Sequence, residues 1–278
     1  MREKNYKGQR ETGIKNQQNK QQTEQTPENA DPERARPKKA QDEIRLNKFV
    51  ANAGVCSRRE ADKLIAEGLI SVNGEVVTAV GTIVKMSDTV VYEGKKLNAE
   101  KLVYVLLNKP KNFVTTLSDP HATHTVMDLV KHACDERIYP VGRLDKMTTG
   151  ILLLTNDGDL AKQLTHPSHE HRKIYHAFLD KEITQDHLDS ITAGFELEDG
   201  FIKSDKISLV EGNAKEVGIE IHSGKNRIVR RIFAHLGYEV VKLDRVYFSG
   251  LTKKDVPRGK WRFLTSKEVT YLKAGIMK

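Results

Sequence analysis

The pattern of apolar residues between residues 43 and 98 changes from helical spacing to strand-like alternation. Apolar side chains from Ile44 to Ala53 recur at helical spacing, and Gly54 is suited to end this helix. Ser57-Arg58-Arg59-Glu60 has the capping-box pattern, which predicts a second helix from about Arg58 to Glu67. The alternating run from Ile70 to Val77 has Asn-Gly at its centre, which is typical of a hairpin. We therefore expect a small α+β module over residues 43–98.

From residue 101 onward, short apolar runs with the length of strands alternate with helical patterns. The strands are expected at residues 103–107, 113–117, 138–141, 151–155, 173–179, 217–221, 240–248 and 261–264. Helices are expected at residues 125–132, 185–193 and 226–236. Two more are expected from their caps: one begins after Asp157, and the last begins at the capping box Thr265–Glu268. This pattern predicts one larger mixed domain over residues 101–278, which is long enough to bury a continuous core.

Residues 1–42 have a different composition, rich in Lys, Gln, Asn, Glu and Pro and poor in large apolar side chains. Such a segment cannot bury enough apolar surface to offset the entropy of ordering, so we expect a disordered basic tail. This tail is interpreted either as a solubilising extension or as an arm that touches nucleic acid through phosphates.

Composition excludes several classes of protein. No apolar run reaches the roughly 18 residues that a membrane span needs, and no secretory signal is recognisable. The two cysteines, Cys56 and Cys134, are too few for a disulfide scaffold, so we expect a cytoplasmic protein. Lysine and arginine number 46 against 38 acidic residues, for a formal net charge of +8, which weakly favours a polyanionic partner. A monomer is expected, because no coiled-coil pattern occurs.

Basic residues of the first module are concentrated on its predicted helix pair. Two short helices that expose guanidinium and ammonium groups can bind a phosphate backbone and fix its orientation without reading sequence. The alternative is an ordinary solvated helix face. The candidate RNA-binding residues are Arg45, Lys48, Arg58, Arg59 and Lys63.

The module as a whole resembles the RNA-binding domain named after ribosomal protein S4. The resemblance rests on the run from Arg45 to Asp62 and on the following Gly68-Leu69-Ile70-Ser71-Val72-Asn73-Gly74. It implies that residues 43–98 bind RNA.

The segment from Val141 to Gly158 places one carboxylate, Asp145, on a loop between two apolar strands. Gly142 and Gly150 bracket this loop and permit unusual backbone angles. A carboxylate in such a place can serve as a nucleophile or a base if it is kept ionised and aimed. Most loop aspartates are turn or cap residues, however, so spacing alone does not make Asp145 catalytic.

The same segment resembles the G-R-L-D-x-x-T-x-G-L-L-L-L-T-N-D-G signature of the RsuA/RluB family of rRNA pseudouridine synthases. Further family motifs occur in order at Leu107–Thr116, His166–Tyr175, Gly224–Phe233 and Lys260–Val269. One departure is Asn112, where the family has glycine. Because asparagine tolerates a left-handed backbone, we expect the turn to survive. The resemblance implies an α+β fold in which a mainly antiparallel mixed sheet with flanking helices follows the small module.

The resemblance implies that the protein isomerises a uridine of ribosomal RNA to pseudouridine without a cofactor or metal. Asp145 is expected to be the catalytic aspartate, Tyr175 the aromatic residue beside the base, and Arg230 the cation that pairs with Asp145. A guanidinium at that place favours the ionised carboxylate. The expected substrate-binding residues are Arg143, which helps to open the RNA or holds a phosphate, Ile228 and Val229 in the pocket wall, and Lys225, Arg227 and Arg231 at phosphates.

Three alternatives remain open at this point. The long basic extension and the form of the Gly224–Phe233 motif favour the large-subunit 23S rRNA, but a small-subunit 16S target is the alternative. A non-catalytic rRNA-binding assembly factor could keep the same fold. Finally, His166, His169, Glu170 and His171 could suggest a zinc site, but their spacing does not supply four ligands in a fixed geometry.

Overall fold

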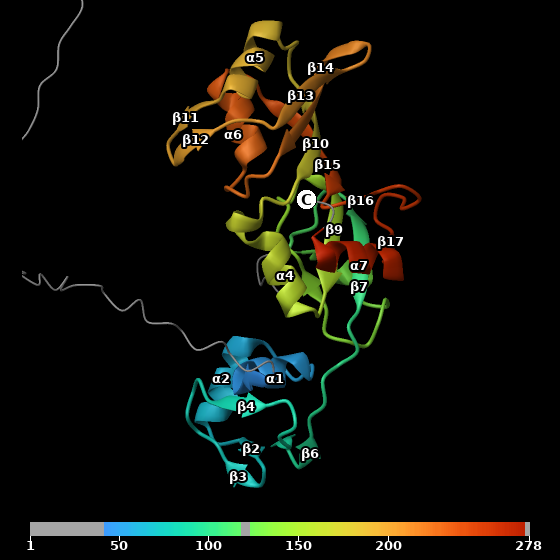
Figure 1. Cartoon of the computed structure of the whole chain (residues 1–278). Helices are drawn as coiled ribbons and strands as arrows, with labels where there is room; N and C mark the ends of the chain where they lie inside the picture. Colours follow the sequence, from blue (N-terminus) through green and yellow to red (C-terminus); the bar gives the residue numbers. More distant parts are fainter. Residues whose placement is uncertain (1–41, 118–122, 276–278) are drawn as a thin grey trace, which may run out of the picture. The chain divides into compact units, whose positions relative to one another are not determined.

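The computed structural model describes residues 42–117 and 123–275. Within the first module, helices α1 and α2 pack together on small sheets (Figure 1). The strands β2, β3, β5 and β6 pair antiparallel in the order β3-β2-β5-β6, and β1 pairs with β4. The elements are β1 (Glu43–Arg45), α1 (Leu46–Asn52), α2 (Arg58–Ala66), β2 (Ile70–Val72), β3 (Glu75–Val76), β4 (Ile83–Lys85), β5 (Val90–Tyr92) and β6 (Lys95–Lys96). The predicted tail, residues 1–42, lies outside the described residues except for Asp42.

The expected helix pair and hairpin are present, with one shift at the start. Ile44 and Arg45 belong to strand β1, and helix α1 begins only at Leu46. The reason is tertiary: Ile44 pairs with Val84 in β4, so its main chain is extended although its side chain follows helical spacing. Ser57 caps α2 as expected, accepting a hydrogen bond from the Glu60 amide.

The larger part of the chain contains one mixed sheet with helices on its faces. Its elements are β7 (Tyr104–Lys109), α3 (Val126–Val130), β8 (Tyr139–Pro140), β9 (Thr149–Thr155), α4 (Gly158–Thr165), a 3-10 turn (Pro167–His169), β10 (Lys173–Leu179), α5 (Gln185–Ala193), β11 (Phe195–Leu197), β12 (Gly200–Ile202), β13 (Lys206–Val210), β14 (Asn213–Ile221), α6 (Ile228–His235), β15 (Val240–Phe248), β16 (Leu251–Thr252), β17 (Trp261–Phe263) and α7 (Ser266–Ala274).

The main sheet of the described residues has nine strands, and its central path is β13-β14-β10-β15-β9-β7-β17. Every pairing along this path is antiparallel except that of β15 with β9, which is parallel. That parallel junction contains two residue pairs, Asp244 with Thr149 and Arg245 with Gly150. The sheet therefore consists of two antiparallel halves joined along a short seam.

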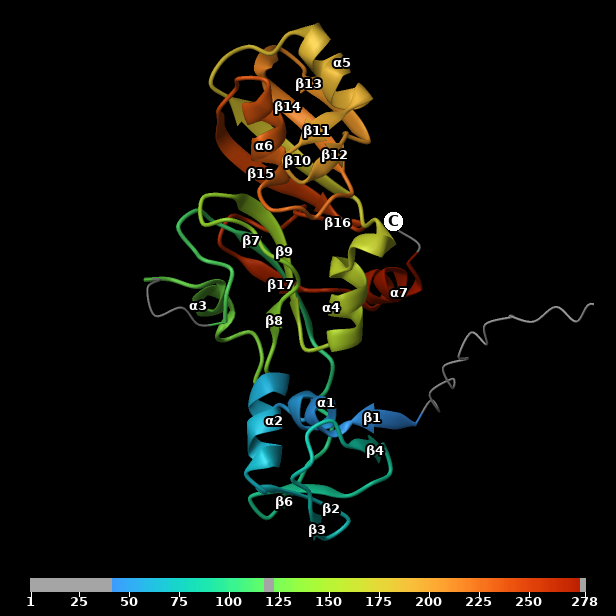
Figure 2. The same ribbon diagram turned by 90° about the vertical axis from the view of Figure 1, so that its left-hand side faces the viewer.

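Helices cover both faces of the β7–β9 half, as Figure 2 shows. Alternate residues of β9 point to opposite faces. Leu152 and Leu154 pack with α3 on one face, whereas Ile151 and Leu153 pack with α4 and α7 on the other. In the β10–β14 half, α5 and α6 pack on the sheet through Leu188, Ile191, Ile232 and Phe233. The strand β9 is buried throughout because it is covered on both sides.

The architecture agrees with the expected α+β class: a small module followed by a mainly antiparallel sheet with flanking helices. Two details differ. Residues 113–117 form no strand but a bend with one isolated bridge from Val114 to Thr125. The strands β11, β12 and β13 were not expected; they are short, and most of their residues are exposed or only partly buried. Among the described residues, no helix is long and apolar enough to cross a membrane.

Candidate functional site

A cavity of about 220 Å³ opens beside the seam between the two halves of the sheet. Three chain segments contribute most of its lining: the loop 141–148, strand β10 with the residues before it, and the segment from residue 222 to 229. Residues of α4 and β15 complete it. Asp145, Tyr175 and Arg227 all line this cavity, although they are far apart in sequence.

The loop that carries Asp145 is held at several points by polar contacts. At its start, Thr115 Oγ1 donates a hydrogen bond to the Leu144 carbonyl at 2.8 Å. Gly142 has a φ of 74° and Gly150 a φ of 106°, as expected for residues that bracket the loop. Asn112 has a φ of 70°, so the turn survives the replacement of glycine. The main-chain amide of Asn112 donates to the Lys146 carbonyl at 3.0 Å.

The buried ammonium of Lys109 lies behind this loop and bonds to its main chain. Lys109 is fully buried, and its Nζ donates to the carbonyls of Asp145 at 3.0 Å, Lys146 at 3.2 Å and Thr148 at 2.8 Å. Burial lowers the pKa of Lys109 to about 8, although the nearby negative charge of Asp145 opposes this shift. Sequence reasoning assigned no role to Lys109. The available signal was a lysine at the end of the apolar run Val103–Leu107, where a buried charge needs several acceptors.

Arg227 and Arg230 both approach the Asp145 carboxylate, at different distances. Arg227 NH1 donates to Asp145 Oδ2 at 3.0 Å, whereas Arg230 Nε lies 3.9 Å from the same oxygen. The expected pairing of Arg230 with Asp145 is therefore an ion pair without a hydrogen bond. Arg227, expected at a phosphate, makes the hydrogen bond instead.

Arg230 and Arg227 also differ in how far they are buried. The Arg230 side chain is 17% exposed and its NH1 donates to the Val240 carbonyl, while the Arg227 side chain is 52% exposed. Burial lowers the pKa of Arg230, and the neighbouring Arg227 adds to that effect. An arginine nevertheless stays protonated at neutral pH. Arg230 is thus a fixed cation behind the carboxylate and Arg227 an exposed one in front of it.

Apolar and aromatic residues form one wall of the cavity. Tyr175 projects from β10, is partly buried, and packs against both neighbouring core clusters. Ile228 and Val229 are buried at the start of α6 and line the same cavity. The structure therefore brings Tyr175, Ile228 and Val229 to the cavity that Asp145 lines.

Two of the expected phosphate-binding residues are engaged with the hairpin β11–β12. Arg231 makes a bidentate contact with the Asp199 carboxylate, at 2.8 and 2.7 Å. Lys225 Nζ donates to the main-chain carbonyl of Asp199 at 2.7 Å and to that of Gly200 at 3.1 Å. The arginine holds the pKa of Asp199 well below its usual range. By contrast, Arg143 is exposed at the edge of the cavity.

Lys173, which was quoted only as part of a motif, also lines the cavity. Its ammonium donates to the carbonyls of His171 at 3.0 Å and His222 at 2.8 Å. Burial lowers the pKa of Lys173 to about 8, and the positive charge of Arg245 adds to the shift. Lys173 thereby ties the segment before β10 to the segment that leads to α6.

The candidate RNA-binding residues of the first module lie on its surface, but not all on helices. Arg45 is exposed at the end of β1, so its placement on the helix pair was wrong. Arg58, Arg59 and Lys63 are exposed on α2 as expected. Lys48 is half-buried on α1, and its ammonium pairs with Asp159 at 2.6 Å.

Two of the three histidines considered for a metal site make hydrogen bonds to serine side chains. His166 Nδ1 contacts Ser168 Oγ at 2.7 Å, and His171 Nδ1 contacts Ser249 Oγ at 3.0 Å. Within residues 42–117 and 123–275, no group of three or more His, Cys, Asp or Glu residues is arranged to hold a metal ion.

Comparison with known proteins reveals relatives of both parts of the chain. A family model described as RNA pseudouridylate synthase matches residues 103–235, and a model of the S4 domain matches residues 44–90. The ribosomal large subunit pseudouridine synthase B of Bacillus subtilis (strain 168) is 41% identical over 234 residues, which cover 83% of this chain and 96% of that relative.

Two further relatives agree with these matches. The dual-specificity RNA pseudouridine synthase RluF of Escherichia coli (strain K12) is 36% identical over 233 residues, covering 81% of this chain and 77% of that protein. A crystal structure of a pseudouridylate synthase has a TM-score of 0.59 and 28% identity, covering 82% of this chain and 99% of that chain.

Proposed function

This chain belongs to the RNA pseudouridylate synthase family, and from that premise we propose that it isomerises a uridine of ribosomal RNA with Asp145 as the catalytic carboxylate. The enzyme is thus an isomerase. The relatives named for large-subunit and dual-specificity RNA substrates support ribosomal RNA as the substrate. Among the subunits we propose the large-subunit 23S rRNA, because the relative with 41% identity carries that name.

The isomerisation needs no co-reactant, since its atoms and electrons balance within the nucleotide. The bond from N1 to C1′ breaks, a bond from C5 to C1′ forms, and the hydrogen on C5 leaves while N1 gains a proton. A carboxylate can start this exchange by attacking the sugar or by removing a sugar proton, and both routes need the ionised form. This chemistry is the reason why we propose a reaction without a cofactor.

The observation that carries the proposal is the position of Asp145 at one cavity with Arg227 and an apolar wall, while Arg230, which does not line the cavity, lies 3.9 Å from the same carboxylate. Arg230 is fixed behind the carboxylate and favours its negative charge. In this proposal Tyr175 packs on the uracil ring, and Ile228 with Val229 exclude water from it, since all three residues line the cavity. These contacts orient a half-exposed loop carboxylate at the cavity.

The target base must leave its stack to reach this cavity, at a cost of a few kcal/mol. Unpaired or looped RNA lowers that cost. We propose that the module over residues 43–98 contributes to holding such RNA through the exposed Arg58 and Arg59, whose contacts to phosphates would fix orientation. Arg143 at the edge of the cavity would hold a phosphate near the target nucleotide.

The proposal is tested by chemical mapping of pseudouridines in ribosomal RNA from a strain that lacks the gene. Complementation with the wild-type gene should restore one or a few pseudouridines, and Asp145→Asn should restore none. The matched control is Asp189→Asn on the exposed face of α5, which should behave as wild type. RNA binding by Asp145→Asn should stay within a few-fold of wild type. If Asp145→Asn restores the same pseudouridines as the wild-type gene, the catalytic role of Asp145 is rejected. If the wild-type gene restores no pseudouridine, a non-catalytic assembly factor is favoured.

A further inference from the structure

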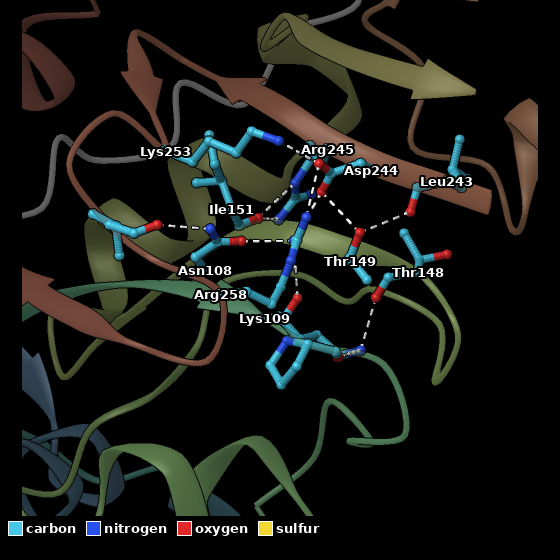
Figure 3. Close-up of polar contacts among 12 residues, drawn as sticks. Asn108, Lys109, Thr148, Thr149, Ile151, Leu243, Asp244, Arg245, Lys253 and Arg258 are labelled. Carbon is cyan, nitrogen blue, oxygen red and sulfur yellow. Dashed lines mark hydrogen bonds and ion pairs between the residues drawn. The ribbon is translucent and has the colours of Figure 1, made fainter. Parts of the chain in front are cut away.

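Behind the cavity, a buried carboxylate occupies the seam where the two halves of the sheet join. Asp244 lies on β15 between Leu243 and Arg245, which line the cavity, but Asp244 is not among the lining residues. Its side chain is 10% exposed and belongs to the polar network drawn in Figure 3. The proposed chemistry leaves this charged group unused.

The Asp244 carboxylate accepts hydrogen bonds from three side chains. Oδ1 accepts from Thr149 Oγ1 at 2.8 Å and from Arg258 NH1 at 3.0 Å. Oδ2 accepts from Arg258 NH2 at 3.0 Å and from Lys253. Burial by itself would raise the pKa of Asp244, but these donors outweigh it and lower the pKa to about 2. The carboxylate is therefore ionised at neutral pH.

The partner Thr149 is the first residue of β9, at the end of the loop that carries Asp145. Thr149 faces Asp244 in the parallel pairing of β9 with β15, and Gly150 faces Arg245. The approach is so close that a Cβ on Gly150 would lie 2.2 Å from the Arg245 carbonyl oxygen. This parallel pairing contains only two residue pairs, so the hydrogen bond from Thr149 to the Asp244 side chain adds a contact at the start of β9, which β7 also pairs with from Gly150 onward.

A second branch of the network reaches the same loop from behind. Arg258 NH1 donates to Asn108 Oδ1 at 2.7 Å and lies 3.4 Å from the Lys109 carbonyl oxygen. Lys109 in turn bonds to the carbonyls of Asp145 and Thr148. Figure 3 shows Arg258 between the carboxylate of Asp244 and the strand end at Asn108 and Lys109.

We propose that Asp244 is a positioning residue for the isomerisation, because it anchors Thr149 and Arg258 and thereby sets the place of Asp145. This inference rests on the proposed function. Thr149 follows Asp145 by four residues, and the Thr148 amide donates to the Asp145 carbonyl at 3.0 Å. A displacement of Thr149 is therefore passed on to the catalytic carboxylate within one tight turn. Misplacement of a reacting group by about 1 Å can cost about 100-fold in rate.

The test compares Asp244→Asn with a substitution in a matched ion pair that lies away from the cavity. Glu268 is a partly buried carboxylate that, like Asp244, has a bidentate arginine partner, here Arg262 at 2.8 and 2.7 Å, and it does not line the cavity. Glu268→Gln is therefore the control. The assay uses transcribed 23S rRNA that contains uridine labelled with tritium at C5, because the C5 hydrogen is released by the reaction.

Asp244→Asn should lower kcat by about 10- to 100-fold while the Kd for the same RNA stays within about threefold. Glu268→Gln should leave kcat within about twofold of wild type, even if it lowers Tm by as much as Asp244→Asn does. Equal losses of kcat in both variants, or unchanged kcat in Asp244→Asn, overturn the proposal. A wild-type protein that releases no tritium, under conditions where it binds the RNA, rejects the proposed function instead.

A second pair of variants applies if Asp244→Asn does not fold. Thr149→Val removes the hydroxyl that bonds to Asp244 and keeps the shape of the side chain, whereas Thr149→Ser keeps the hydroxyl. Thr149→Val should lower kcat by about fivefold or more, while Thr149→Ser should stay within about twofold of wild type. Equal activity in Thr149→Val and Thr149→Ser would also overturn the proposal.

Discussion

Arg227 donates a hydrogen bond to Asp145 across 82 residues of sequence, with 3.0 Å between NH1 and Oδ2. Arg227 caps α6 in a left-handed conformation with a φ of 48°, and Arg230 follows one helical turn later. One carboxylate oxygen therefore faces an exposed cation and a buried one. Because only Arg227 can leave for an RNA phosphate without breaking a contact to the main chain, the two arginines should have separable effects.

The first prediction separates these effects kinetically. Arg230→Gln should lower kcat by about 100-fold or more with little change in KM, because it removes the cation fixed behind the carboxylate. Arg227→Gln should mainly raise KM, by about tenfold, because it removes an exposed cation that is free to move to an RNA phosphate. Both constants are measured by tritium release from labelled 23S rRNA. The opposite assignment, with the larger loss of kcat in Arg227→Gln, would make Arg227 the functional partner of Asp145.

The second prediction concerns the carboxylate that engages Arg231 and Lys225. Asp199→Asn should free Arg231 for RNA, so that RNA affinity rises at low salt, whereas Lys225 keeps its contacts to main-chain carbonyls. The plot of log K against log salt concentration should become steeper by about 1, since each added phosphate contact contributes about 0.9. Asp189→Asn changes the net charge by the same amount and serves as the control. If Asp199→Asn binds RNA like that control, Arg231 only holds the hairpin β11–β12.

The third prediction follows from the buried ammonium of Lys109. Its pKa is lowered to about 8, so Lys109 is a cation below that pH and neutral above it. The neutral amine has one donor fewer for the loop carbonyls, and activity should therefore fall as pH rises through 8. A single group with this pKa predicts a loss of about tenfold in kcat between pH 7 and pH 9.

Two variants identify the group responsible for this alkaline decrease. Lys109→Met should have low activity that no longer depends on pH in this range. Lys173→Met keeps Lys109 and should keep the decrease, although the pKa of Lys173 is also about 8. A decrease that persists in Lys109→Met and disappears in Lys173→Met would transfer the assignment to Lys173.

The fourth prediction tests the first module as an RNA-binding surface. The double substitution Arg58→Ala and Arg59→Ala removes two exposed guanidinium groups from α2. RNA affinity should fall similarly for different RNA sequences, and the salt slope should flatten by about 1 to 2, because these contacts would be to phosphates. The kcat at saturating RNA should stay within about twofold. If the RNA affinity and the salt slope are unchanged, Arg58 and Arg59 belong to an ordinary solvated surface and do not bind RNA.

Local patterns in the sequence were sufficient for most elements of the fold. The cap at Ser57 and the buried run of β9 were predicted from residues within one or two turns. Asn112 also behaved as predicted, since its left-handed preference depends on its own side chain. The prediction failed at residues 113–117, where an apolar run with β-branched residues forms a bend, because Thr115 is drawn to Leu144 and not to a neighbouring strand.

The sequence by itself determined the family motifs, the position of Asp145 between two glycines, and the amphipathic start of α6, since each depends on residues close together in the chain. Only the tertiary structure decided which cation contacts Asp145, that Lys225 and Arg231 are engaged with Asp199, and that Asp244 lies against Thr149. Arg227 and Arg230 lie on one helix turn and are chemically equivalent in sequence. Their different burial arises from the packing of α6 on β15, which no local pattern encodes.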